Sequence, residues 1–209
     1  FLHNLLNLSV MTLLFGGLVA IMASSQFMGP LPFLLLMTPL MGVLFFALYI
    51  LVIHEASHNM FISAKAKSTS LFWNRLFGWA ISIPFATNYL RHWEEGHIFH
   101  HLHPVEEGDR QTVNLLTGPE FIKRLLMMLF VPGYVFLWNP SRQYKTQRWL
   151  PIANLAFWAG AIALTVALLP WWAALGYLIA IQVVGALNQL KGSLEHGGPV
   201  GFEENAFLR

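Results

Sequence analysis

Residues 31–58 read LPFLLLMTPLMGVLFFALYILVIHEASH, an apolar run that ends in two histidines four positions apart. The first 23 of these residues, 31–53, contain no charged side chain. A helix needs about 20 apolar residues, at 1.5 Å rise each, to cross about 30 Å of hydrocarbon. We therefore predict a transmembrane helix over 31–53 that ends where the two histidines begin.

The charges of the whole chain follow the same division. Only 11% of the 209 residues are charged, against roughly 25% in an ordinary soluble domain. No charged residue lies in 4–53 or in 149–190. This distribution excludes a soluble globular protein and a disordered one. The net charge of only +2 excludes a strongly basic nucleic-acid binder, so we expect no nucleic-acid partner.

Each uncharged block is long enough for two crossings and contains a helix breaker near its middle, Gly29-Pro30 in the first block and Pro170 in the second. We therefore predict an all-α membrane protein with four transmembrane helices in two hairpins. The expected spans lie at about 6–25, 31–53, 150–169 and 171–190.

Both hairpins would return the chain to one side of the membrane, together with the segments 54–149 and 191–209. All twelve Lys and Arg fall on that side, and the positive-inside rule makes it cytoplasmic. The expected location is the inner or plasma membrane. The segment 54–149 would form a cytoplasmic helical cap, with its apolar stretches 71–90 and 121–138 in the membrane interface. A fifth and a sixth span are the alternative for these stretches.

Histidine is the residue type best suited to carry chemistry in this chain. There are nine histidines and no cysteine, which excludes disulfides, thiol nucleophiles and cysteine-ligated metal centres. Five histidines form two compact sets, which are His54 and His58, then His97, His100 and His101. Helix positions i, i+3 and i+4 share one face, and imidazoles gathered there can bind zinc, copper, iron or nickel. We therefore predict a metal site at the cytoplasmic face.

The first set also matches HExxH, the pattern of zinc proteases, in which Glu55 would be the general base. A one-zinc protease needs only one further ligand, so a second set of three histidines would be surplus. A metal carrier is another alternative, but a transport site should place its ligands in mid-span. No histidine lies in 4–53 or in 149–190. A two-metal site accounts best for both sets.

These residues resemble the membrane fatty acid desaturase family, which couples HxxxH or HxxxxH to HxxHH. The chain has His54-x-x-x-His58, then Asn74-Arg75-Leu76-Phe77-Gly78, then His97-x-x-His100-His101, and the intervening Asn-Arg-Leu-x-Gly is similar to that of the family. Glu195-His196-Gly197-Gly198 resembles the segment that precedes a third box. The resemblance covers about residues 40–209. Related membrane hydroxylases and alkane monooxygenases have similar boxes.

The resemblance implies a non-haem diiron centre, with two iron ions and O2 as co-substrate, that removes hydrogen from unactivated C–H bonds of a lipid. The product would be a cis double bond in a fatty acyl chain, and hydroxylation is the alternative outcome. The implied iron ligands are His54, His58, His97, His100, His101 and His196. Side-chain acids and bases do not break such bonds, so a redox metal is required, and zinc has no redox chemistry.

Other residues near the two boxes have weaker assignments. Candidates to orient imidazole N–H groups are Glu55, Glu94, Glu95 and Asp109, and the favoured alternative is that they are solvated charges. His92 and His103 flank the second box without a counterpart in the family, and we do not expect them to be ligands. Tyr89 and Trp93 are candidates to line a substrate tunnel, and the interfacial aromatic belt explains them equally well.

The family has a third histidine box, which does not occur before Arg209. We expect one desaturase-like domain over 1–209 that continues beyond Arg209 in the natural protein, and we expect these residues alone to bind iron poorly and to be inactive. No flavin, haem or iron–sulfur motif is present, so an external ferredoxin or b-type cytochrome would supply electrons. The ten Lys and Arg against seven Asp and Glu in 55–148 would help dock an acidic donor, although positive-inside topology also explains this excess.

Overall fold

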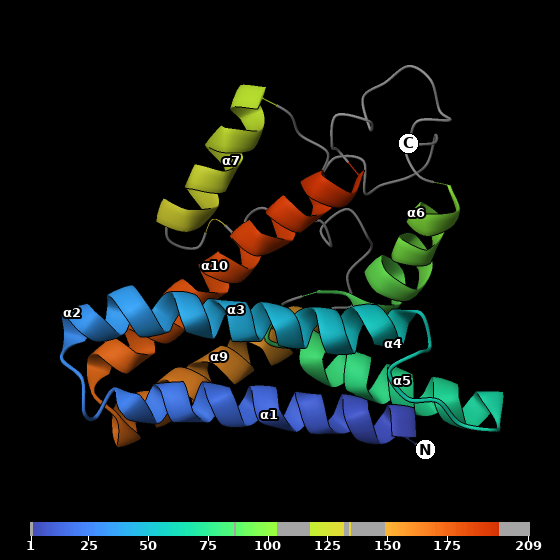
Figure 1. Cartoon of the computed structure of the whole chain (residues 1–209), viewed down its shortest axis with the longest axis horizontal. Helices are drawn as coiled ribbons and strands as arrows, with labels where there is room; N and C mark the ends of the chain where they lie inside the picture. Colours follow the sequence, from blue (N-terminus) through green and yellow to red (C-terminus); the bar gives the residue numbers. More distant parts are fainter. Residues whose placement is uncertain (1, 86, 104–117, 132–133, 135–148, 197–209) are drawn as a thin grey trace.

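The structure is a computed structural model that describes residues 2–85, 87–103, 118–131, 134 and 149–196. Within these residues every regular element is a helix (Figure 1). Four of the helices are long and apolar enough to cross a membrane, which confirms the predicted number for the described part of the chain. They are α1 (Leu2–Ser24), the continuous helix Pro30–Ser57, α9 (Trp149–Leu168) and α10 (Trp171–His196).

The helix Pro30–Ser57 carries His54, and His58 follows it as the C-cap residue. Along the chain the helix consists of α2 (Pro30–Pro32), the π-helical segment η1 (Phe33–Met37), α3 (Thr38–Tyr49), the π-helical segment η2 (Ile50–His54) and α4 (Glu55–Ser57). Proline suits the first helical position because the N–H that it lacks has no intrahelical partner there. The helix continues beyond the predicted span end at position 53, so His54 and Glu55 lie on it rather than after it.

The remaining helices are shorter than a crossing requires. They are α5 (Lys67–Ser82), η3 (Tyr89–His97), α6 (Ile98–Leu102) and α7 (Gly118–Phe130). α5 has 16 residues and α7 has 13, against about 20 for a span. The described residues therefore do not form a fifth or a sixth span. Positions 132–133 and 135–138 of the second stretch lie outside the described residues.

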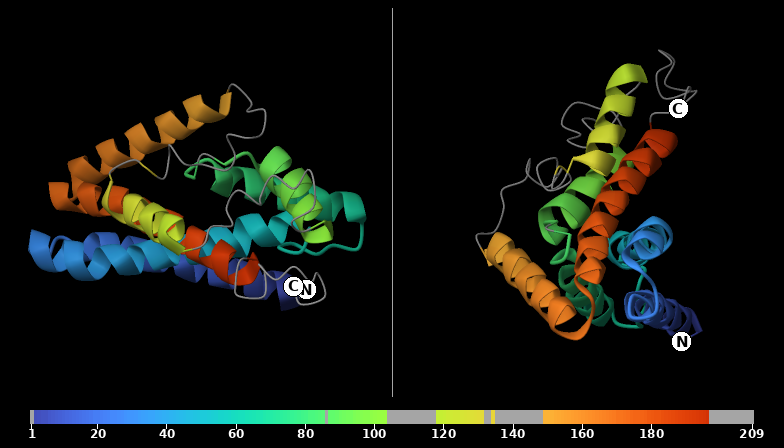
Figure 2. Two further views of the ribbon diagram at one scale, coloured as in Figure 1. Left: turned by 90° about the horizontal axis from the view of Figure 1, so that it is seen from above. Right: turned by 90° about the vertical axis from the view of Figure 1, so that its left-hand side faces the viewer.

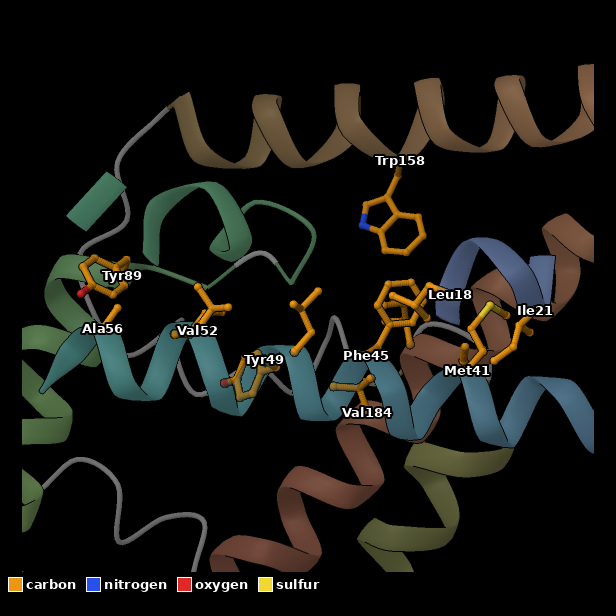
Figure 3. Packing of buried hydrophobic residues seen from close by; sticks show 14 of the residues in the cluster. Leu18, Ile21, Met41, Phe45, Tyr49, Val52, Ala56, Tyr89, Trp158 and Val184 are labelled. Carbon is orange, nitrogen blue, oxygen red and sulfur yellow. The ribbon is translucent and has the colours of Figure 1, made fainter. Parts of the chain in front are cut away.

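α3 is the centre of the packed core. α10 packs along α3 more extensively than any other pair of described elements, and α1 also lies against α3 (Figures 1 and 2). Gly42 permits the approach of α10, because a Cβ at this position would lie 2.5 Å from the Cβ of Val183. On the α9 side, the buried ring of Trp158 points toward Phe45 of α3 (Figure 3).

The turn that follows α5 is bound by α9. The carbonyls of Ile83 and Pro84 accept hydrogen bonds from Nδ2 of Asn154 at 2.6 and 3.2 Å, and Pro84 also accepts one from Nε1 of Trp158 at 2.9 Å. Asn154 and Trp158 lie about 8 and 14 Å along α9 from its first residue, at 1.5 Å per residue. Carbonyls near a helix end need partners in apolar surroundings. Asn154 and Trp158 of the α9 span thus donate hydrogen bonds to the backbone carbonyls of the turn beside it.

Candidate metal centre

The first histidine pair lies at the end of the helix Pro30–Ser57. His54 is the last residue of η2, and His58 is the C-cap residue of α4. Their ring centroids are 4.8 Å apart, as expected for positions i and i+4 on one helix face. Nδ1 of His54 lies 3.0 Å from Oε1 of Glu55. This contact engages Nδ1 and leaves Nε2 available to a metal.

The second histidine set meets the first from the segment that follows α5. His97 ends η3 and His101 lies on α6, and their Nε2 atoms are 3.0 Å apart. The ring centroid of His97 is 4.9 Å from that of His54 and 5.4 Å from that of His58. The ring centroid of His101 is 4.9 Å from that of His58. The structure therefore brings together two histidines from each predicted set.

These four histidines have the geometry needed to hold a metal ion. One nitrogen each from His54, His58, His97 and His101 lies within 4.8 Å of the others. With metal–nitrogen distances of about 2.1 Å, ligand nitrogens are about 3.0 Å apart at 90° and about 4.2 Å apart across the ion. The separation of the His97 and His101 nitrogens matches the 90° value, and small side-chain rotations would close the widest pair. An all-imidazole site suits iron, copper, nickel or zinc.

The surroundings of the cluster favour neutral imidazoles. Burial lowers the pKa of His58, the neighbouring His54 lowers it further, and Glu55 acts in the opposite direction. Burial also lowers the pKa of His101, with further contributions from the neighbouring histidines and Lys191. A metal binds the neutral form of imidazole. Both lowered pKa values therefore favour the form that binds metal.

Of the other two predicted ligands, His100 lies outside this four-histidine group, which comprises described side chains only. His100 is 1% exposed, and its ring centroid is 6.3 Å from that of His97 and 5.9 Å from that of His101. His196 is the last residue of α10, and its side chain is not among those that the structure describes.

The acidic candidates differ in what they contact. Glu55 lies against His54, as described above. Arg75 Nε lies 2.8 Å from Oε1 of Glu94, and this ion pair joins α5 to η3. Glu95 pairs with Arg91 of the same helix at 2.6 Å. The fourth candidate, Asp109, lies outside the described residues.

Aromatic residues pack beside the cluster. Trp93 is 5% exposed, its ring centroid is 4.9 Å from that of His97, and its Nε1 donates to Oγ1 of Thr87 at 3.0 Å. His92 stacks on Trp93 with centroids 5.2 Å apart, and burial lowers the pKa of His92 to about 4. His103 is exposed at the other end of α6. Neither His92 nor His103 belongs to the four-histidine group found among the described residues.

The motif at 74–78 has a physical role that the sequence did not reveal. Asn74 is fully buried, and its amide binds the backbone of Ile62 just beyond the first histidine pair. Gly78 faces the start of η3, because a Cβ at this position would lie 2.2 Å from the ring of Tyr89. Arg75 of the same motif pairs with Glu94. Asn74 thus positions the segment after the first histidine set, and Arg75 and Gly78 position the segment before the second set.

Four apolar helices, with a histidine cluster at the end of one of them, define a membrane protein with a candidate metal centre. Residues 29–208 match the sequence profile of the fatty acid desaturase family. Because this match covers most of the chain, the protein belongs to that family, and membership indicates an oxidoreductase that modifies lipids. Comparison with curated proteins and with solved structures found no match.

Proposed function

We propose that this protein oxidises C–H bonds of lipids with O2 at a non-haem diiron centre, and that it introduces a cis double bond into a fatty acyl chain. The observation that carries the proposal is the convergence of two helix-spaced histidine pairs in one four-nitrogen group at the end of an apolar helix. Membership of the desaturase family supports the same class of reaction. A single-zinc protease would not need both pairs, so we favour oxidation over proteolysis.

The residues present fit iron. One ion would be held by neutral nitrogens of His54, His58, His97 and His101, and the second would draw on His100 and His196. When bound, iron supplies the one-electron and O2 chemistry that side chains lack. Glu55 would hold His54 in the tautomer with its proton on Nδ1. The buried ring of Trp93 would exclude water from the inner side of the cluster.

A row of aromatic rings leads from the cluster into the helix bundle. In order from the cluster these rings are Trp93, Tyr49, Phe85, Phe45, Tyr177 and Trp158, with consecutive centroids 4.9–6.4 Å apart. Ligand sites are lined mostly by apolar and aromatic side chains. These rings belong to the packed core and make the inner side of the cluster apolar, which suits a lipid substrate.

The proposal also includes the membrane topology of the protein and its electron donor. The four spans would pair as two hairpins in the inner or plasma membrane, with the histidine cluster and the segments 54–149 and 191–209 facing the cytoplasm. The confinement of Lys and Arg to these segments supports this orientation. Electrons would come from a ferredoxin or a b-type cytochrome that docks on the cytoplasmic side. The third box beyond Arg209 stays a prediction.

Lipid analysis after expression of the completed gene, with the predicted third box, in a host that lacks desaturases tests the proposed reaction. New double bonds in acyl chains are the expected result, and new hydroxyl groups would instead identify a membrane hydroxylase on the same scaffold. His54→Ala and His97→Ala should each abolish the product. His103→Ala should not, because His103 is exposed and lies outside the four-histidine group. Unchanged lipids, with cleavage of a membrane protein that Glu55→Gln prevents, would favour the protease.

A further inference from the structure

The turn at residues 59–63 follows the first histidine pair directly. The helix Pro30–Ser57 is followed by Asn59, whose φ of 59° lies in the left-handed region. His58 precedes it as the C-cap residue, with φ −81° and ψ 2°, which are not helical values. The helix caps this end itself, because the N–H groups of His58, Asn59 and Met60 donate to the carbonyls of His54, Ala56 and Glu55 at 3.3, 2.9 and 2.8 Å. The position of His58 also depends on what holds the turn that comes next.

Helix α1 holds this turn from one side. Asn4 binds Ser63 twice, since its Nδ2 donates to the Ser63 carbonyl at 2.7 Å and its Oδ1 accepts from the Ser63 N–H at 2.8 Å. Nδ2 of Asn7 donates to the carbonyl of Phe61 at 2.8 Å. Nε2 of His3, one residue before Asn4, also contacts the backbone carbonyl of Met60 in this turn. The polar side chains at the start of α1 therefore all reach the same turn.

Helix α5 holds the turn from the other side. Nδ2 of Asn74 donates to the carbonyl of Ile62 at 2.7 Å and to Oδ1 of Asn59 at 2.9 Å. Its Oδ1 accepts the N–H of Ile62 at 3.0 Å. Ser70, one helical turn earlier, donates from Oγ to the same carbonyl at 2.7 Å. Asn74 is fully buried, so its bonds are protected from exchange with water.

We propose that Asn4, Asn7 and Asn74 form a clamp that positions His58 for metal binding, although none of them is a ligand. The proposal rests on the proposed metal function of the histidine cluster. It gives α1 a part in the site although that helix supplies none of the four histidines.

The location of the polar residues on α1 supports this role. Most of α1 is apolar and only Leu18 and Ile21 of its side chains are buried, so the helix packs through a small part of its surface. Polar side chains near the end of a span are costly in an apolar environment unless they have partners. Asn4 and Asn7 find theirs in the backbone beside His58 rather than within α1.

Co²⁺ binding by the full chain in detergent, followed by visible d–d absorption, tests the clamp. Asn74→Ala and the double substitution Asn4→Ala/Asn7→Ala should each weaken Co²⁺ binding about tenfold, the effect typical of residues that orient metal ligands. Asn4→Asp should have a smaller effect, because it keeps the acceptor for Ser63 N–H and loses only the donor. Thr12→Ala is the matched control on α1, since Thr12 binds only Leu8 of its own helix. It should bind Co²⁺ like the unmodified chain.

A double-mutant cycle distinguishes positioning of His58 from a general loss of stability. In a His58→Ala chain, the two α1 substitutions should weaken Co²⁺ binding no further, because the clamp acts through His58. Additive losses, or unmodified affinity in the clamp variants, would overturn the proposal. If Asn74→Ala does not fold, the partly exposed Asn4 and Asn7 still decide the question. Failure of the metal function itself would appear differently, as Co²⁺ binding that does not depend on His54 or His97.

Discussion

At the scale of single residues, Glu55 contacts a histidine of the cluster, because its Oε1 lies 3.0 Å from Nδ1 of His54. A carboxylate on the second ring nitrogen orients the imidazole and increases its basicity. We expect Glu55→Ala to lower Co²⁺ affinity about tenfold, measured by competition with a chelator, and Glu55→Gln to lower it less. Glu95→Ala is the control, because Glu95 is 57% exposed and pairs with Arg91. Equal losses in the two alanine variants would contradict the orienting role of Glu55.

His92 gives the protein a predictable response to acid. Burial lowers its pKa to about 4 in the folded state, whereas an unfolded histidine has a pKa near 6.5. Above pH 6.5, His92 is neutral in both the folded and the unfolded chain. Between about pH 6.5 and 4, His92 binds a proton only in the unfolded chain. Stability of the metal-free chain should therefore fall as the pH decreases through this window, by up to about 3 kcal/mol from this residue. Thermal unfolding in detergent should show a shallower pH slope for His92→Phe, and an unchanged slope would refute this.

At the scale of helices, the packing of η3 on α5 depends on Gly78. A Cβ there would lie 2.2 Å from the ring of Tyr89, which is fully buried. We expect Gly78→Ala to lower the free energy of unfolding by about 1–3 kcal/mol through overpacking, measured by thermal unfolding in detergent. Gly160→Ala, in α9, is the matched control, because nothing lies within 4 Å of its added Cβ. That change should be neutral or slightly stabilising, and similar effects at both glycines would contradict the packing argument.

The helical spacing of the histidines predicted much of the cluster, because backbone geometry fixes which positions of a helix share a face. It did not separate His100 from His101. A π-helix, η3, ends at His97 where α6 begins, and sequence spacing alone does not specify such a junction. The contacts of Asn4 and Asn74 with the turn after His58 were also not predictable. They join separate helices through side chain–backbone bonds, which produce no periodic pattern.

At the scale of the whole molecule, the uncharged blocks located all four long helices within a few residues, because the thickness of the hydrocarbon layer sets the length of an apolar span. Their ends were less predictable. The helices Pro30–Ser57 and Trp171–His196 continue past the apolar blocks, since backbone hydrogen bonding does not stop at the membrane boundary. The first of these extensions places His54 in the cluster.

The proposed orientation can be measured because the chain contains no cysteine, so a single introduced cysteine is labelled without background. Gln26 is exposed between α1 and α2, and Ser68 is exposed near the start of α5, so the helix Pro30–Ser57 separates them. With the histidine cluster in the cytoplasm, a membrane-impermeant maleimide should label Gln26→Cys in intact cells, and Ser68→Cys only after the membrane is opened. The reverse pattern would place the cluster at the outer face, where a cytoplasmic electron donor has no access. Labelling of both in intact cells would show that the helix Pro30–Ser57 does not cross the membrane, and the four-span arrangement would then fail.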